Sequence, residues 1–380
     1  MGLSYPAGMK VPWILLFTLA GFSAAAEVIA INGDDELRRA IASLKDGVTL
    51  KIKGGDYRGG WSVKGISQLT VEAADPANPP HFKNGNLGWQ FSRCPGLTVR
   101  NLIVSGQRHN GFNIDDGGVR DKPVKGVTLS GLKVSEIGPK GNFDGIKCSG
   151  IDDLVIKECE VSGWGGQAID FVGCHRAVIS DCRFTGRPGF SQTTGPQFKG
   201  GSSDIVIESC FFKDAGMRPI QAGGSTGMSY FRPPGAKYEA RKITIRDNTI
   251  VGGMCAVAFT GVDGAVFVRN VVVSPDKWIL RILQETTAPG FPACRNVHSH
   301  HNVIVFDRAK VRGVVNIGSN TAPKTFRFEN NLWYATDRPG RSKPSLPVTE
   351  TGGIYDFDPR LDAKTHRPSA AKAKALLKAR

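Results

Sequence analysis

The chain has 380 residues, of which 40 % are hydrophobic and 22 % are charged, and its formal net charge is +15. This composition is sufficient for a sizeable core, and the length permits more than one domain. The 47 glycines and the scarcity of helical apolar stripes favour many turns and short strands over a helical fold. The sequence contains no nucleotide-binding glycine loop, zinc cluster or serine-hydrolase elbow, which excludes those classes of site.

Residues 1–26 have the pattern of a signal peptide. Lys10 precedes the apolar stretch VPWILLFTLAGF, and an Ala-x-Ala site predicts cleavage after Ala26. The apolar stretch is too short for a membrane span, and no later segment approaches one. We therefore expect a protein that is exported to the periplasm or secreted, with no membrane insertion, and that is a monomer.

The positive charge predicts a polyanionic partner. Only one of the charges belongs to the signal peptide. Because the protein is expected to be exported, an acidic polysaccharide is a better candidate than nucleic acid. The alternative is that the charge serves only to keep the protein in solution.

Residues 27–50 are predicted to form an N-terminal cap region. The stretch DDELRRAIASLKDG (34–47) has an acidic start, an apolar stripe and a terminating glycine, which are typical of a short helix. A helix at this place would cover the open end of a sheet and so prevent pairing with another chain.

An internal repeat in residues 51–362 predicts the fold. Segments such as LTVRNLIV (97–104), LVIKECEV (154–161) and ITIRDNTI (243–250) share alternating apolar residues, two polar residues and then Asn, Gly or Cys. The repeats recur at intervals of 22 to 38 residues. Such a period with strand-like alternation indicates a solenoid in which each turn buries its apolar residues against its neighbours. We predict one all-β domain, a single-stranded right-handed parallel β-helix, rather than several domains.

The residue after the two polar positions is predicted to form a stacked column at a bend, where Asn tolerates a left-handed backbone. The column comprises Asn101, Gly131, Cys159, Cys182, Cys210, Asn248 and Asn270, with Asn302 and Asn331 in the matching place. Cysteines in an exported chain first suggest disulfides. The stacked positions instead favour a buried thiol ladder for Cys159, Cys182 and Cys210. Residues 363–380 are predicted to be a basic, solvated C-terminal tail.

A second column is polar and faces outward. Strands such as QAIDF (167–171) and PQFKG (196–200), aligned on their inward apolar residue, place six side chains in register: Asp115, Lys147, Asp170, Lys199, Gln221 and Thr260. Further polar residues flank this column, namely Asn113, Asp144, Gln167, Gln197 and Arg218. The alternative is that opposite charges on neighbouring strands stabilise the sheet and have no other role.

An insertion follows Gln221 and carries Tyr230, Phe231, Arg232 and Arg241. Solenoids place binding loops beside such polar strips, so the insertion is expected to form the rim of a groove. The predicted substrate-binding residues are Asn113, Gln167, Gln197, Gln221, Tyr230 and Arg232.

The repeats and the capping helix resemble the pectate-lyase superfamily of β-helices over roughly residues 30–360. The segment FKGGSSDIVIESCFFKDAGMRPIQAGG (198–224) resembles the Lys-then-Arg pair of chondroitinase B-like and alginate lyases, and DGIK (144–147) resembles an Asp-rich calcium strand of lysine-dependent pectate lyases. The resemblance implies Lys199 as a base, Arg218 as its partner, and calcium held by Asp115, Asp144 and Asp170. Lys147 and Asp170 complete the predicted catalytic set.

These residues suit β-elimination from a uronic acid. The proton at C5 becomes acidic when the adjacent carboxylate is neutralised by a cation, and a lysine can then accept it. Other functions remain open: a glycoside hydrolase using Asp115, Asp116, Asp144 or Asp170, a uronate epimerase, or a carbohydrate-binding protein without catalysis. The hydrolase alternative lacks the Gly-His-Gly and Arg-Ile-Lys motifs of polygalacturonases. The sequence does not identify the polysaccharide.

Overall fold

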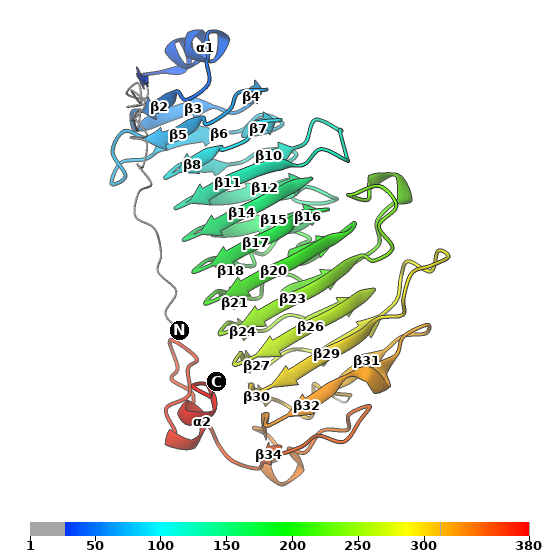
Figure 1. The fold of residues 1–380 in the computed structure, drawn as a ribbon. Helices are drawn as coiled ribbons and strands as arrows, with labels where there is room; N and C mark the ends of the chain where they lie inside the picture. The colour runs from blue at the N-terminus through cyan, green and yellow to red at the C-terminus, as the bar shows by residue number, and fades with distance from the viewer. Residues whose placement is uncertain (1–26, 312, 380) are drawn as a thin grey trace, which may run out of the picture.

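The computed structural model describes residues 27–311 and 313–379, and this part of the chain forms a solenoid of three parallel sheets (Figure 1). The predicted signal peptide lies outside the described residues. No helix in the described ranges is long and apolar enough to cross a membrane. The prediction of an all-β parallel β-helix is confirmed.

From β2 to β31 each turn of the solenoid contributes one strand to each sheet, in the order first, second, third sheet. The first sheet contains β1 (Val28–Ile31), β2 (Thr49–Ile52), β5 (Thr70–Ala73), β8 (Thr98–Arg100), β11 (Val124–Ser130), β14 (Ile151–Lys157), β17 (His175–Ser180), β20 (Ser202–Glu208), β23 (Ala240–Arg246), β26 (Val262–Val268), β29 (Arg295–His300) and β32 (Arg327–Glu329). The second sheet contains β3 (Gly55–Arg58), β6 (Pro80–Lys83), β9 (Ile103–Ser105), β12 (Lys133–Ile137), β15 (Glu160–Trp164), β18 (Arg183–Thr185), β21 (Phe211–Lys213), β24 (Thr249–Val251), β27 (Val271–Val273), β30 (Val303–Phe306), β33 (Leu332–Ala335) and β34 (Ile354–Tyr355). The third sheet contains β4 (Trp61–Lys64), β7 (Trp89–Ser92), β10 (Phe112–Asp115), β13 (Ile146–Ser149), β16 (Gln167–Val172), β19 (Thr194–Lys199), β22 (Ile220–Gly223), β25 (Cys255–Thr260), β28 (Trp278–Leu283) and β31 (Val315–Ile317).

Helices are few among the described residues. The α-helices are α1 (Asp34–Ala42) and α2 (Ala371–Leu376), and the short 3₁₀ turns are η1 (Met228–Tyr230), η2 (Pro323–Thr325) and η3 (Pro339–Arg341). Three acidic residues occupy the first turn of α1, where the helix dipole favours negative charge. Leu37 and Ala40 of α1 are buried, and the helix lies at the N-terminal end of the solenoid (Figure 1).

The core consists of inward side chains that stack on like side chains of the next turn. In the first sheet Ile156, Ile179 and Ile207 are in direct register on consecutive strands, and all are fully buried. Strands in such a sheet are about 4.8 Å apart, so each apolar residue packs on the one above and the one below. The repeat in the sequence is therefore the repeat of this core.

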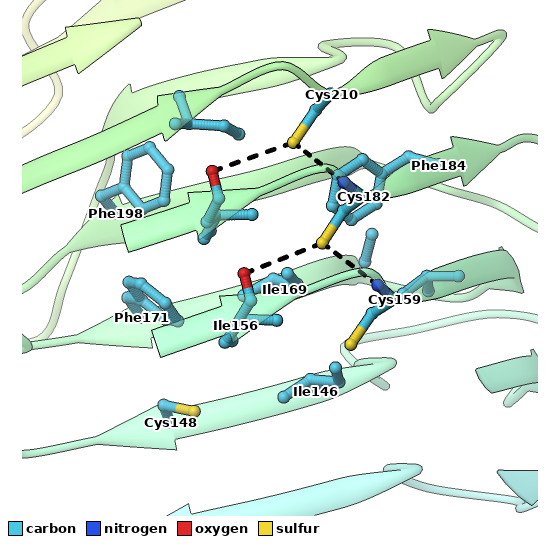
Figure 2. Close-up of a cluster of buried hydrophobic side chains, with 14 of the residues drawn as sticks. Ile146, Cys148, Ile156, Cys159, Ile169, Phe171, Cys182, Phe184, Phe198 and Cys210 are labelled. Atoms are coloured by element: carbon cyan, nitrogen blue, oxygen red, sulfur yellow. Dashed lines mark hydrogen bonds between the residues drawn. The ribbon is translucent and has the colours of Figure 1, made fainter. Parts of the chain in front are cut away.

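A ladder of buried Cys and Asn side chains runs along the bend between the first and second sheets. Figure 2 shows its thiol part, where the backbone N–H of Cys159 donates to Sγ of Cys182 at 3.5 Å and that of Cys182 donates to Sγ of Cys210 at 3.4 Å. The ladder continues because the N–H of Cys210 donates to Oδ1 of Asn248 at 2.9 Å. Asn248, Asn270, Asn302 and Asn331 then repeat the same bond from turn to turn. All eight cysteines are buried and free, which confirms the predicted thiol ladder.

The predicted membership of this ladder is wrong in the early turns. The register aligns Leu102, Leu132 and Cys159 on three successive turns. Asn101 and Gly131 each lie one residue before this aligned position. That earlier position holds the left-handed backbone, with φ of 57° at Asn101 and 56° at Glu158. The side chains of the ladder residues point inward and accept a hydrogen bond from a backbone N–H of the turn before. Asn and Cys are therefore suited to these positions by their hydrogen-bond acceptors, and not by tolerance of a left-handed backbone.

The C-terminal tail packs against the solenoid, contrary to the prediction of a solvated tail. Outward valines of β27 and β30, together with Leu332 of β33, form an apolar cluster with the fully buried Ala373 of α2. Figure 1 shows α2 beside the C-terminal end of the solenoid. Burial of this apolar face accounts for the order of the tail.

The insertion after β22 folds back over the third sheet and is held there by a buried ion pair. The Arg232 guanidinium donates through Nε to Oδ2 of Asp116 at 2.6 Å and through Nη2 to Oδ1 at 3.1 Å. Both side chains are almost inaccessible, with exposures of 9 % for Arg232 and 1 % for Asp116. Glycines make the space, because a Cβ on Gly150 would lie 2.2 Å from Oδ2 of Asp116 and one on Gly173 would lie 2.2 Å from Cβ of Arg232.

A second buried carboxylate holds the insertion at its two ends. Glu239 is fully buried and accepts hydrogen bonds from the N–H and hydroxyl of Thr226 at 2.9 and 2.7 Å. The same carboxylate accepts from the N–H of Gly200 at 2.9 Å and from the hydroxyl of Thr286. The insertion is thus fixed to the turn that carries Lys199.

The Asn ladder should contribute measurably to stability. Asn270→Ala removes the acceptor of the Asn248 N–H and leaves that buried group unpaired, so we expect the free energy of unfolding to fall by about 1–3 kcal/mol. Denaturant unfolding measures the change. Asn86→Ala, at an exposed turn, is the matched control, and equal stability of the two variants would contradict this role of the ladder.

The buried ion pair should determine whether the insertion stays docked. Asp116→Ala leaves the Arg232 guanidinium without its partner, at a cost of about 3–5 kcal/mol. We expect faster protease cleavage and amide exchange within residues 224–239. Glu136→Ala, which breaks the exposed pair with Arg187, is the control and should leave both rates unchanged. Unchanged cleavage in Asp116→Ala would show that other contacts hold the insertion.

Candidate active site

The polar side chains of the third sheet form two outward columns and not the single predicted one. One column contains Asn113, Lys147, Asp170, Gln197 and Gln221. The other contains Asp115, Ser149, Val172, Lys199 and Gly223, followed by Thr260. On β19 the residue paired with Asp170 is Gln197, and Lys199 lies two residues after Gln197. The prediction that Asp115, Lys199 and Thr260 share a column with Lys147 and Asp170 is therefore wrong.

The reason for the error is the period of a strand. The prediction aligned Ile169 with Phe198, but the backbone pairs Ile169 with Pro196 and Phe171 with Phe198. A shift by two residues keeps every side chain on the same face, so the apolar pattern is equally satisfied in both alignments. The two columns are nevertheless adjacent on one face, which keeps their side chains within reach of one another.

A cleft of about 750 Å³ lies over this face, between the sheet and the insertion. Its lining comprises Ser92, Asn113, Asp115, Asp116, Gly117, Gly118, Asn142, Lys147, Ser149, Asp170, Val172, Lys199, Ser225, Thr226, Gly227, Tyr230 and Arg232. The predicted site residues Asn113, Asp115, Lys147, Asp170, Lys199, Tyr230 and Arg232 are thus brought together. Ser92, Asn142, Ser149 and the Ser225–Gly227 turn were not predicted, because no repeat or motif distinguishes them in the sequence.

Two lysines and two aspartates form a charged cluster at the floor of the cleft. Nζ of Lys147 lies 2.5 Å from Oδ2 of Asp170 and 3.1 Å from Oδ2 of Asp144. Nζ of Lys199 lies 3.0 Å from Oδ1 of Asp170, without the alignment of a hydrogen bond. The carboxylates are fully buried, whereas the lysine side chains keep exposures of 24 % and 14 %. The cluster therefore presents its ammonium groups to the cleft and hides its carboxylates.

The pKa shifts in the cluster follow from burial and from these contacts. Burial alone would raise the pKa of Asp170, but Lys199 and Lys147 outweigh it and hold that pKa below its usual value. Burial and the charge of Asp170 raise the pKa of Asp144. Burial disfavours the charge on Lys147, but attraction to Asp170 and Asp144 prevails and raises its pKa. Lys147 is thus a permanent cation at neutral pH.

Asp115 belongs to a separate hydrogen-bond network. Its carboxylate accepts bonds from Gln90 Nε2 and Ser92 Oγ at 2.7 Å, and from Asn113 Nδ2 and the Gly117 N–H at 2.8 Å. Among the described residues no group of three or more His, Cys, Asp or Glu side chains is placed to hold a metal ion. Asp115, Asp144 and Asp170 do not fit the predicted calcium site in this arrangement, because they are not grouped around one point: Asp115 is bonded to amides and a hydroxyl, and Asp144 and Asp170 lie against lysines.

Five predicted site residues lie outside the cleft lining: Asp144, Gln167, Gln197, Arg218 and Gln221. Arg218 donates through Nη1 to Oε1 of Gln221 at 2.7 Å, and Gln197 donates to the carbonyl of Gly223 at 3.1 Å. Gln167 is buried, with its N–H bonded to Oδ1 of Asp144. Arg232 lines the cleft, but its guanidinium is taken up by Asp116. Its role in this structure is therefore to hold the insertion.

Comparison with solved structures finds the same fold with distant sequences. An alginate lyase from Paenibacillus sp. str. FPU-7 has a TM-score of 0.50 and 17 % identity, covering 78 % of this chain and 97 % of its own. An exopolygalacturonase from Thermotoga maritima has a TM-score of 0.55 and 15 % identity, covering 82 % and 88 %. A GH136 lacto-N-biosidase from Eubacterium ramulus has a TM-score of 0.59 and 11 % identity, covering 87 % and 68 %.

Comparison by sequence gives a family but no individual relative. A search of curated proteins found no match. The family described as "Right handed beta helix region" matches residues 83–273, which span the strands of the cleft and the insertion. This match, the three parallel sheets and the similar solved folds agree with one another. The chain belongs to the family of right-handed β-helix proteins.

Proposed function

We propose that the protein is a polysaccharide lyase that cleaves a uronic-acid polysaccharide by β-elimination, with Lys199 as the base and Lys147 as the cation that binds the uronate carboxylate. The supporting observation is the orientation of the charged cluster. Its two ammonium groups face the cleft, and its carboxylates are fully buried beneath them. An anionic sugar in the cleft would therefore meet the two lysines before the buried carboxylates.

The role of Lys147 follows from its two carboxylate partners. Asp144 and Asp170 keep Lys147 charged while leaving part of its side chain exposed. A fixed cation beside the uronate carboxylate stabilises the negative charge that develops when the C5 proton leaves. The sequence resemblance named Arg218 as the partner of Lys199, but Arg218 lies outside the cleft lining.

The role of Lys199 rests on its position and on its weaker hold on Asp170. Asp170 already forms a short hydrogen bond to Lys147, and its contact with Lys199 lacks hydrogen-bond alignment. In the reaction Lys199 accepts the C5 proton, the C4–C5 double bond forms, and the C4–oxygen bond breaks. The departing oxygen takes a proton from the Lys199 ammonium or from water in the open cleft.

A hydrolase is less well supported by the same geometry. Two free carboxyl groups must flank the glycosidic bond in that reaction. Asp144 and Asp170 are buried under lysines, Asp116 is held by Arg232, and Asp115 accepts four hydrogen bonds. Each carboxylate offered for hydrolysis on the sequence is thus already engaged. An epimerase would use the same base and is separated from a lyase by its product.

The proposed activity is tested by following the ultraviolet absorbance of unsaturated uronates during incubation with a panel of acidic polysaccharides. We expect an increase with one substrate class, and we expect it to persist with a chelator because the aspartates do not fit calcium as placed. Activity that is lost with chelator and restored by calcium would show that they rearrange around the ion. Reducing ends without absorbance would indicate a hydrolase, and C5 hydrogen exchange without either would indicate an epimerase.

Lys199→Ala should reduce the rate of elimination by about 10²–10⁴-fold, the usual contribution of a general base. Lys64→Ala is the matched control, because Lys64 lies in the same outward column of the third sheet but outside the cleft lining. Its rate should equal that of the wild type. A fully active Lys199→Ala with an intact fold would exclude the proposed mechanism.

A further inference from the structure

The outward column that contains Lys147 and Asp170 continues past the cleft. In register after Asp170 come Gln197, Gln221, Ala258, Arg281 and Asn316. Arg281 lies on β28, three strands beyond the strand of Lys199, which corresponds to about 14 Å along the solenoid. The face that forms the cleft floor therefore carries a second group of cations further along.

Arg218 and Arg281 flank a single strand with small side chains. Arg218 precedes β22 and donates to Gln221, and Arg281 donates through Nε to Oδ1 of Asn316 at 3.0 Å. Between them, on β25, Ala258 occupies the shared column and is fully buried. Arg281 is close enough to Arg218 for the Arg218 charge to lower its pKa, so the two guanidinium groups lie on the same part of the face.

Neither arginine has a carboxylate partner in the part of the chain that the structure describes. Both are missing from the ion pairs of residues 27–311 and 313–379, in which Arg232, Arg246, Arg269 and Arg295 take part. The Nε of Arg218 is buried and lacks a hydrogen-bond acceptor. Burial lowers the pKa of Arg281 and repulsion by Arg218 adds to this effect, while Cys255 and Glu285 oppose it without reversing it. Two close cations with an unused donor form a site that lacks an anion.

The tryptophan at the start of β28 adds to this concentration of positive charge. The Arg281 guanidinium lies 4.8 Å from the centre of the Trp278 ring, and Nζ of Lys277 lies 4.5 Å from it. Cation–π contacts of this kind fix the direction of a cation without neutralising its charge. The guanidinium is thus held in place by its ring contact and its Nε bond to Asn316, and its Nη groups stay available for a planar anion.

We propose that Arg218 and Arg281 form a subsite that binds the carboxylate of a sugar residue in the acidic polysaccharide whose other residues occupy the cleft. Guanidinium groups bind carboxylates through paired N–H donors, and the column that runs from Lys147 to Arg281 gives the direction of a chain between the cleft and the arginines. The inference rests on the proposed function for the identity of the ligand. It assigns to Arg218 a binding role on the far part of the face instead of the catalytic role expected from the sequence.

The subsite is tested by binding, which does not require turnover. The probes are hexamers of galacturonate and of mannuronate, with carboxyl-reduced neutral hexamers for comparison, titrated by calorimetry into Lys199→Ala protein. Adding Arg281→Gln should weaken binding of the charged hexamer about tenfold or more, as expected for the loss of a charged hydrogen bond. Binding of the neutral hexamer should be unaffected. Arg218→Gln should have an effect of the same kind, and Arg281→Lys should give an intermediate one.

The control is Arg295→Gln, which removes one positive charge from the outward face of the first sheet. It should leave the affinity unchanged, and melting temperatures verify that each variant is folded. An unchanged affinity in Arg281→Gln, or an equal loss for the neutral hexamer, would overturn the subsite, as would a failure of both charged hexamers to bind.

The outcome also separates this inference from the proposed function. Arginine-dependent binding by a protein that yields no unsaturated product from any substrate would support the subsite and reject the lyase. Elimination by the wild type with no dependence of hexamer binding on Arg281 would support the lyase and reject the subsite.

Discussion

Parallel in-register stacking of one turn on the next is the constraint on which the rest of this structure depends. Each strand forms its backbone hydrogen bonds with the strands of the turns before and after it. A turn therefore cannot shift relative to its neighbours without breaking these bonds. From Cys159 to Asn331 the buried Cys and Asn ladder extends this constraint into the bend, where a side chain of one turn accepts an N–H of the turn before. The same stacking brings residues distant in sequence into single columns on the surface.

The charged cluster is a consequence of this stacking. Lys147 and Asp170 face each other because β13 and β16 are neighbours, and Lys199 reaches Asp170 from the adjacent column of β19. A carboxylate as buried as Asp170 would cost several kcal/mol without its partners. Two lysines satisfy it and remain partly exposed. Buried ion pairs add little net stability in general, so a cluster of this kind is better explained by the chemistry it presents to the cleft.

The insertion completes the cleft through contacts that lie outside the repeat. Arg232 and Asp116 are 116 residues apart in sequence, and their pair occupies a space that glycines leave open at the corner of the solenoid. Glu239 fixes the ends of the same insertion to the turn of Lys199 and to Thr286. Tyr230, between these two points, is consequently held at the cleft although its own side chain is 60 % exposed.

The sequence by itself determined the solenoid, the thiol ladder and the face on which the polar residues gather. Alternating apolar residues at a regular interval permit only a stack of strands, and a strand's period of two assigns each side chain to one face. The alignment of the columns along that face was decided only by the tertiary structure, because a shift by two residues preserves the alternation, as between Ile169, Pro196 and Phe198. The roles of Arg218 and Arg232 were likewise undetermined, since an arginine's partner depends on how a loop folds and not on any period in the chain.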